Sequence, residues 1–147
     1  MNNRLSNGFI AGAIGAIILA VIMYIMQAMG MDQPAFVTMY RGSFGENPPS
    51  DQFIAAVLFI ISGGIWGAIF ALVVKDPTIV KGMLFGFLPT LWLWVAVNGF
   101  MGKPLFNGFL AKGIIMPIIF NVVIWGSFVG WYMANRLKKG YNTQRTM

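Results

Sequence analysis

Apolar residues in this chain gather in four long runs that are separated by short polar stretches. A helix needs about 20 apolar residues to cross the hydrocarbon core of a bilayer. Lipid offers no partners to backbone polar groups, and the runs are unbroken rather than alternating, so we expect helices and not the strands of a barrel. The predicted spans are residues 8–29, 52–74, 82–101 and 113–134.

The composition supports lipid as the solvent around most of the chain. Hydrophobic residues make up 58% of the 147 positions and charged residues 10%, whereas a typical soluble domain is about 25% charged. A soluble domain of this size could not bury so much apolar surface, because a small body is mostly surface. We therefore expect a single integral membrane domain over residues 1–147, an all-α bundle of four transmembrane helices.

The first loop, residues 30–51, has a pattern of its own. A mostly apolar segment, Phe36–Tyr40, follows Pro34 and precedes Gly42. Proline is typical of helix starts and glycine of helix ends. The pattern predicts a short helix that lies on the outer membrane interface.

Two further polar stretches are expected to bound the spans. Ser50 and Asp51 are helix-capping residue types and stand immediately before the second apolar run. Asn135 and Arg136 follow the fourth run and are expected to end its helix, which leaves a basic cytoplasmic tail over residues 135–147.

Lysine and arginine are distributed unevenly, and this distribution predicts the orientation. Cytoplasmic segments of membrane proteins carry an excess of these residues. Seven fall on the side of the two termini and three on the other side, which predicts cytoplasmic termini in a bacterial inner membrane. The seven are Arg4, Lys75, Lys81, Arg136, Lys138, Lys139 and Arg145, and the three are Arg41, Lys103 and Lys112.

The same distribution accounts for the formal net charge of +6. The basic residues form short flanks and not a basic face interleaved with aromatics, so we expect the lipid bilayer as a partner and no nucleic acid.

The residue inventory excludes several kinds of chemistry. The chain has no cysteine and no histidine, which removes thiolate and imidazole groups as nucleophiles, acid–base catalysts and metal or haem ligands. No predicted span contains Asp or Glu. The loop carboxylates Asp32, Glu46 and Asp51 are expected to be solvated or to cap helices and not to bind a metal. We expect a protein without enzymatic activity, cofactor or metal.

Small residues recur every four positions in each predicted span. This spacing places them on one helix face, where helices in lipid can approach closely. The ladders are expected either to pack the bundle or to face another subunit. They comprise Gly8, Gly12 and Ala16; Gly63, Gly67 and Ala71; Gly82 and Gly86; and Gly126, Gly130 and Ala134.

Equivalent positions of these ladders suggest an internal repeat. Gly8 and Gly12 open the first span as Gly82 and Gly86 open the third, and the second and fourth spans carry their ladders in corresponding places. Two parallel helical hairpins would produce this pattern, as would chance, because glycine is common in membrane helices.

Prolines and neutral polar residues mark the third and fourth spans. Pro89 and Pro117 lie inside them and would free the carbonyls four residues earlier, which Thr90 and Asn121 are close enough to bond. Hydrogen bonding between helices is the expected role of the polar residues. The alternative is a broken-helix site with a polar cavity, formed by Thr90, Asn98 and Asn121.

Several short motifs together resemble a family of small, glycine-rich, four-helix bacterial membrane proteins that is classed as a domain of unknown function. They are Gly8–Gly12, Tyr40–Gly45, Ser62–Gly67, Lys81–Gly86 and Gly99–Gly102. The resemblance spans most of the chain and implies the fold and topology, with no assigned activity. Some similar members carry a histidine early in the second helix, which this chain lacks.

Abundant packing surface without reactive side chains favours a non-enzymatic bundle. We expect an accessory or scaffold subunit of a larger membrane complex, or a homo-oligomer. The alternative is a small channel or carrier for a neutral or hydrophobic solute, built around the proline-containing spans.

Overall fold

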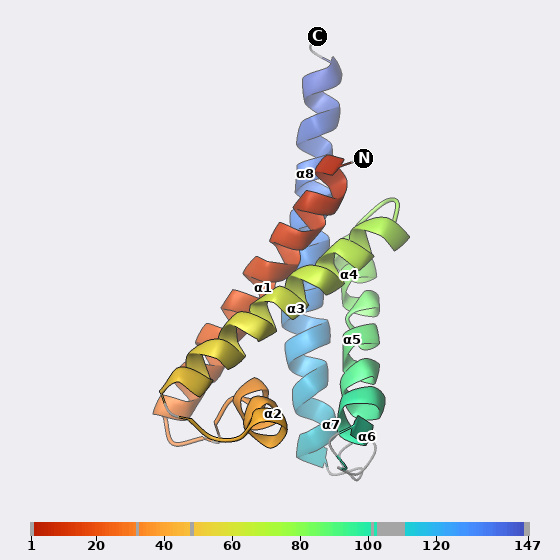
Figure 1. The fold of residues 1–147 in the computed structure, drawn as a ribbon. Coiled ribbons are helices and arrows are strands. Elements are labelled where there is room, and N and C mark those ends of the chain that lie inside the picture. The colour runs from red at the N-terminus through yellow and green to blue at the C-terminus, as the bar shows by residue number, and fades with distance from the viewer. Residues whose placement is uncertain (1, 32, 48, 101, 103–110, 146–147) are drawn as a thin grey trace.

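A computed structural model describes residues 2–31, 33–47, 49–100, 102 and 111–145. Every regular element among them is a helix (Figure 1). The first half of the chain forms α1 (Asn2–Ala28), α2 (Ala35–Phe44) and α3 (Ser50–Val73). The second half forms α4 (Ile79–Phe85), α5 (Phe87–Leu91), the π-helical η1 (Trp92–Val97), α6 (Asn98–Phe100), α7 (Ala111–Ile118), the π-helical η3 (Ile119–Gly126) and α8 (Ser127–Arg145).

Four helical stretches are long and apolar enough to cross a membrane, which confirms the four-run prediction at that level. They are Arg4–Ala28, Ser50–Val73, Ile79–Phe100 and Ile114–Lys139. Their outward faces carry large exposed apolar side chains, such as Ile25, Leu72 and Phe100. Such faces suit lipid rather than water.

Several helix ends differ from the predicted ones. α1 begins at Asn2 instead of residue 8, and α2 runs past Gly42 to Phe44, where Gly45 adopts a φ of 86°. The fourth span does not end at Asn135 and Arg136, because α8 continues to Arg145. No proline interrupts the tail, and basic residues near a helix C-terminus interact favourably with its dipole.

The first two spans pack against each other through their small residues. A methyl group added to Gly8 would stand 2.5 Å from the carbonyl oxygen of Gly67 and 2.6 Å from the Ala71 side chain. One added to Gly63 would meet the side chain of Ala16 at 2.6 Å. α1 and α3 therefore form one antiparallel hairpin whose backbones touch.

The third and fourth spans form a second hairpin of the same kind. A methyl group on Gly126 would lie 2.5 Å from the carbonyl oxygen of Gly82, and one on Gly130 would overlap the backbone of Thr78. Gly86 lies against the backbone of Asn121. α1 also packs against α8 and η3, so it joins the two hairpins.

The proline-containing spans are irregular. The third span is interrupted at Gly86, and beyond Pro89 it widens into η1. The fourth contains Pro117 within α7 and widens immediately afterwards into η3. A proline removes one intrahelical hydrogen bond, and π-helical turns are one way in which a helix absorbs such a local mismatch.

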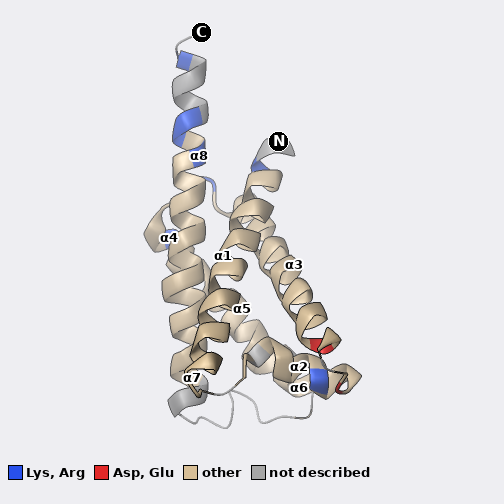
Figure 2. Ribbon diagram, turned by 90° about the vertical axis from the view of Figure 1, so that its left-hand side faces the viewer, with Lys and Arg blue, Asp and Glu red and all other residues tan. Residues whose placement is uncertain are grey.

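Both termini lie at the same end of the molecule (Figure 1). Figure 2 shows lysine and arginine positions of the ribbon gathered at that end, whereas α2 lies at the opposite end beside acidic positions. This placement agrees with the even number of spans.

Arg4 joins the two helices of the first hairpin at the end of the molecule where the termini lie. Its guanidinium donates hydrogen bonds to the carbonyl oxygens of Ala71 at 2.6 Å, Lys75 at 2.8 Å and Val74. These carbonyls lie at or just beyond the C-terminus of α3, where backbone carbonyls lack an intrahelical partner, so Arg4 caps the negative end of the helix dipole.

Candidate functional site

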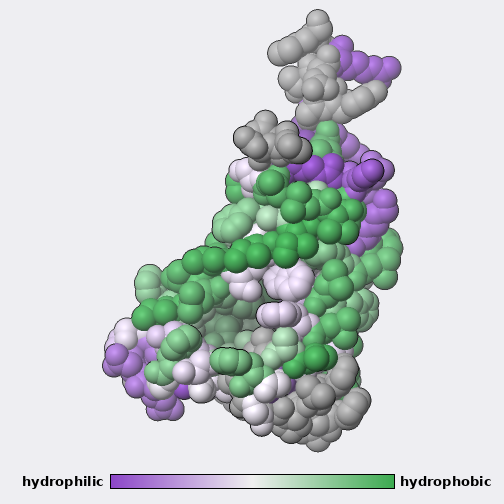
Figure 3. Space-filling model, turned by 45° about the vertical axis from the view of Figure 1, so that its right-hand side comes forward, coloured by the Kyte–Doolittle hydropathy of each residue, from purple (hydrophilic) through white to green (hydrophobic). Residues whose placement is uncertain are grey.

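The two hairpins lie close together toward the end with the termini and diverge toward α2 (Figure 1). Between them is a cavity of about 250 Å³ that is lined by seventeen residues. Figure 3 shows the molecule hollowed on the face that α3 crosses. The lining is dominated by aromatic and methionine side chains, and none of its described members is charged. Binding sites for small molecules are typically concave and mostly apolar, with a few polar groups.

The second hairpin supplies one wall from its irregular segments. Pro89 and Pro117 both line the cavity, as do Trp92 of η1 and Phe120 of η3. The widened turns that follow the prolines thus lie at the cavity and not elsewhere in the spans. π-helical turns inside α-helices occur frequently at functional sites.

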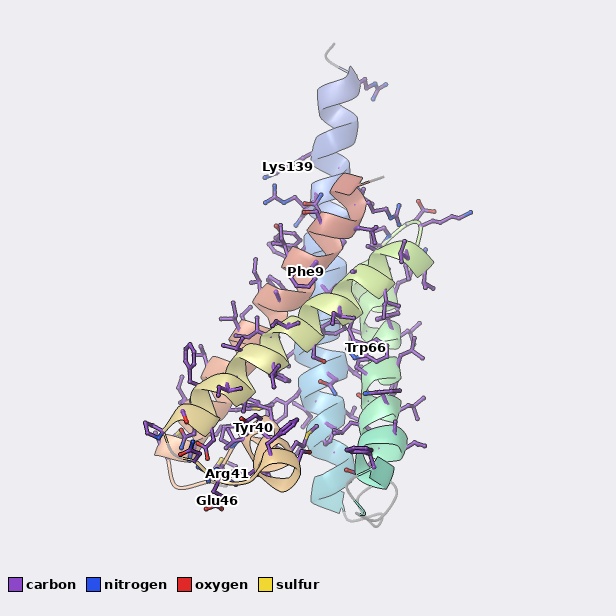
Figure 4. The ribbon with its side chains drawn as sticks, viewed as in Figure 1. Phe9, Tyr40, Arg41, Glu46, Trp66 and Lys139 are labelled. Carbon is purple, nitrogen blue, oxygen red and sulfur yellow. The ribbon has the colours of Figure 1, made fainter. Side chains whose placement is uncertain are left out.

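Aromatic side chains close the end of the cavity nearer the termini. Trp66 projects from α3 toward the third span (Figure 4), and its ring centroid lies 6.2 Å from that of Phe85. Phe85 in turn stacks near Trp125 at 6.4 Å and meets Phe70 edge-on at 5.2 Å. These rings fill the space between the hairpins there.

α2 forms the wall at the opposite end. Phe36 lies parallel to Phe59 of α3, with ring centroids 4.7 Å apart, and meets Tyr24 of α1 edge-on at 5.7 Å. Met39 also lines the cavity. The short helix therefore packs on the first hairpin as well as contributing to the site.

An ion pair holds α2 against the start of α3. Arg41 Nε donates to Asp51 Oδ2 at 2.8 Å, and Arg41 Nη1 donates to Gln33 Oε1 at 3.0 Å. The backbone N–H of Asn47 also donates to Asp51 Oδ2, at 3.1 Å. The hydrogen bond to Asp51 raises the pKa of Arg41, so the guanidinium stays charged.

The start of α3 differs from two sequence-based expectations, one for Asp51 and one for Ser50. Its side chain is buried, with 1% of the residue exposed, so it is not a solvated loop charge. Ser50 does not cap α3 either, because its hydroxyl donates to the Asn47 carbonyl at 2.8 Å and accepts nothing from the helix. The chain folds back over ten residues from Arg41, and a buried carboxylate needs that counter-charge.

Asn121 is the polar side chain that the second hairpin places at the cavity. Its Nδ2 donates to Thr90 Oγ1 at 3.2 Å, and Thr90 Oγ1 donates to the carbonyl of Gly86 at 2.9 Å. Thr90 and Asn121 were expected to bond the carbonyls freed by the prolines. They instead form these two consecutive hydrogen bonds, which link η3 to α5. Thr90 is fully buried behind Asn121.

Trp125 connects the two hairpins directly. Its Nε1–H donates to the carbonyl oxygen of Gly12 at 3.1 Å, and a methyl group on Gly15 would meet its ring at 2.8 Å. Trp125 also lines the cavity. Nothing in the spacing of the sequence points to this bond, since the residues are 113 positions apart.

The polar residues predicted to share a cavity are only partly brought together. Thr90 and Asn121 are bonded, but Asn98 is not among the described residues that line the cavity. Asn98 is buried near the far end of the third span. The cavity is therefore more apolar than the one predicted.

The predicted packing glycines, together with Ala16 and Ala71, fall at the contacts within the two hairpins, and Ala134 is half-buried in α8. Within the described part of the chain, no three acidic side chains lie close enough together to hold a metal ion. Asp32, one of the loop carboxylates, is outside the described residues. The site consists of shape, apolar surface and a few neutral hydrogen-bonding groups.

No family model matches the chain, and searches of curated proteins and of solved structures find no similar protein. The resemblance of the short motifs to a membrane family thus stays a prediction.

Proposed function

We propose that the protein is a multi-pass membrane protein that binds a neutral, mainly hydrophobic small molecule taken from the bilayer. The cavity of about 250 Å³ between the hairpins carries this proposal. It is comparable to the smallest typical ligand pockets, and its lining would favour an apolar occupant over water.

Access from lipid follows from where the cavity opens. Ser62 and Trp92 line it and are also exposed, and they lie on the flanks of α3 and η1. If the four spans cross a bilayer, this face is surrounded by acyl chains. A hydrophobic molecule could then enter sideways without crossing water.

The hairpin contacts weigh against the other expected function, an accessory subunit or homo-oligomer assembled through the small-residue ladders. Gly8, Gly63 and Gly67 already face each other within the first hairpin, as Gly82 and Gly126 do in the second. These surfaces are occupied inside the chain, so a partner would need a different face.

The proposed setting is a bacterial inner membrane with both termini in the cytoplasm and α2 on the outer interface. The uneven distribution of lysine and arginine supports this orientation. The location of α2 and Arg41 at the end opposite the termini supports it as well (Figures 1 and 4).

Tryptophan fluorescence offers a direct test, because Trp66, Trp92 and Trp125 line the cavity. A terminal bromoalkane quenches an indole only at short range. We expect it to quench the purified protein saturably in detergent. Replacing Trp131 with phenylalanine would remove an exposed indole that does not line the cavity.

A matched pair of variants separates binding from non-specific partition. Ser62→Phe adds a ring at the mouth of the cavity, whereas Ile61→Phe adds one to the neighbouring exposed position on the same helix. Saturable quenching should fall several-fold in Ser62→Phe and persist in Ile61→Phe. Unsaturable quenching that is equal in both variants would exclude the proposed site.

A further inference from the structure

The orientation of the Asn121 amide follows from its hydrogen-bond chain. The Gly86 carbonyl can only accept, so the single Thr90 hydroxyl proton must point to it. Thr90 Oγ1 can then only accept from Asn121, which requires the NH₂ group of the amide on that side. The carbonyl Oδ1 then lies on the other side of the amide and takes no part in these two hydrogen bonds.

The surroundings of Asn121 make this acceptor unusual. Asn121 is half-buried, and the rest of the second hairpin's wall consists of proline, aromatic, leucine and methionine side chains. A hydrogen bond in such apolar surroundings discriminates well, because a ligand that cannot make it leaves the polar group unpaired.

We propose that the Asn121 side chain recognises a hydroxyl group of the ligand by accepting a hydrogen bond from it. The ligand is then a single-chain amphiphile with an uncharged hydroxyl head. Oδ1 accepts the hydroxyl proton while the apolar body occupies the aromatic part of the cavity. This inference rests on the proposed function and specifies the chemical class of its ligand.

The neutrality of the head follows from the lining. None of the described residues that line the cavity is charged, and an ionised carboxylate or amine would lose its hydration without a counter-charge. Arg41 does not supply one, because Asp51 and Gln33 already occupy its guanidinium. A hydroxyl needs only the amide.

Thr90 is a positioning residue in this scheme. It touches Asn121 and not the cavity, and it fixes which end of the amide is free. Its replacement by valine keeps the shape and removes the hydroxyl. Asn121 would then lose its fixed orientation but remain at the cavity wall.

The test compares three probes of equal chain length by quenching of the cavity tryptophans: a bromoalkane, the corresponding ω-bromoalcohol and the methyl ether of that alcohol. Affinities are corrected for the partition of each probe into the micelle. We expect the alcohol to bind about three- to tenfold more tightly than the alkane, because one net hydrogen bond is gained. The ether, which cannot donate, should bind like the alkane.

The variants locate the effect. Asn121→Leu should abolish the preference for the alcohol while the alkane still binds, and Thr90→Val should reduce the preference. Ser127→Ala is the control, because the Ser127 hydroxyl bonds carbonyls of its own helix and does not line the cavity. It should leave the preference unchanged.

The outcomes distinguish the two proposals. Equal affinity of the wild-type protein for all three probes, or equal affinity for alcohol and ether, would overturn the hydroxyl inference and leave the binding function standing. A preference that survives Asn121→Leu would also overturn it. Failure of every probe to quench saturably would instead remove the binding function itself.

Discussion

The glycines at the helix contacts set the distance between the helices of each hairpin, because their side chains are single hydrogen atoms. A methyl group on Gly67 would lie 2.8 Å from the Cα of Gly12 and would overlap the carbonyl oxygen of Gly8. Both neighbours are backbone atoms and cannot rotate away. In lipid, where no hydrophobic force holds helices together, such close backbone contact supplies much of the attraction.

Gly67→Ala should therefore weaken the first hairpin. We expect a loss of about 1–3 kcal/mol in the free energy of unfolding, as for overpacked cores. Equilibrium unfolding in mixed micelles, followed by circular dichroism, would measure it. Gly99→Ala is the matched control, because a methyl group there meets no atom within 4 Å; a similar loss in both variants would contradict the packing argument.

Sequence spacing predicted which residues form the ladders but not which ladder meets which. Residues four apart share a helix face whatever the tertiary structure is. Whether that face meets another span or another subunit depends on helix pairing. The bond from Trp125 to Gly12 and the pair of Arg41 with Asp51 were missed for the same reason, since neither has a spacing signature.

At the scale of elements, α2 depends on its attachment to α3. Helices of its length are marginal alone, and α2 has ten residues. Phe36 and Val37 are buried against the first hairpin, and Arg41 bonds the buried Asp51. Packing and the ion pair together hold one wall of the cavity in place.

Breaking the pair from the arginine side should loosen α2. Arg41→Met would leave the Asp51 carboxylate buried beside an apolar chain, so we expect faster amide hydrogen exchange over residues 35–44. Asp51→Asn retains hydrogen-bonding atoms and should have a smaller effect. The double variant Arg41→Met, Asp51→Leu should exchange more slowly than Arg41→Met, and unchanged exchange in Arg41→Met would refute a holding role.

The four spans were the most predictable elements, because their length and hydropathy are fixed by the sequence. The continuation of α8 to Arg145 does not follow from hydropathy, because charged residues also form helices in water. The prolines signalled irregular spans, but the extent of η1 and η3 depends on packing as well.

At the scale of the whole molecule, both termini share one end, and α2 shares the other with the ends of α1 and α7 (Figure 1). The proposed orientation then requires Glu46 and Lys139 to be on opposite sides of the membrane, as Figure 4 places them at opposite ends. The complete absence of cysteine makes this arrangement simple to test.

Single cysteines introduced at Glu46 and at Lys139 report the two sides. A membrane-impermeant maleimide added to intact spheroplasts should label Glu46→Cys and should label Lys139→Cys only after permeabilisation, because charged reagents do not cross lipid. Mass shifts on a gel would measure both. The reverse pattern would invert the topology, and labelling of both without permeabilisation would exclude it.

The cavity could not be predicted from the sequence. It arises because the two hairpins touch near the terminal end and diverge away from it, which is a property of crossing angles and not of residue spacing. The sequence did single out Asn121 and Thr90, since neutral polar residues are rare in the spans, but it wrongly added Asn98 to the same cavity. Aromatic lining residues such as Trp66 and Phe120 gave no signal among many other apolar positions.

The hydrogen bonds from Arg4 to the carbonyls at the end of α3 have a consequence for the biosynthesis of the protein. Arg4 bonds Ala71, Val74 and Lys75, so the first hairpin has its packing faces and its cap within the first half of the chain. Synthesis runs from the N-terminus, so that half is made and leaves the ribosome ahead of α4 and the helices that follow it. We expect the nascent chain to form this hairpin first, so that the later helices enter the membrane beside an already folded pair of helices.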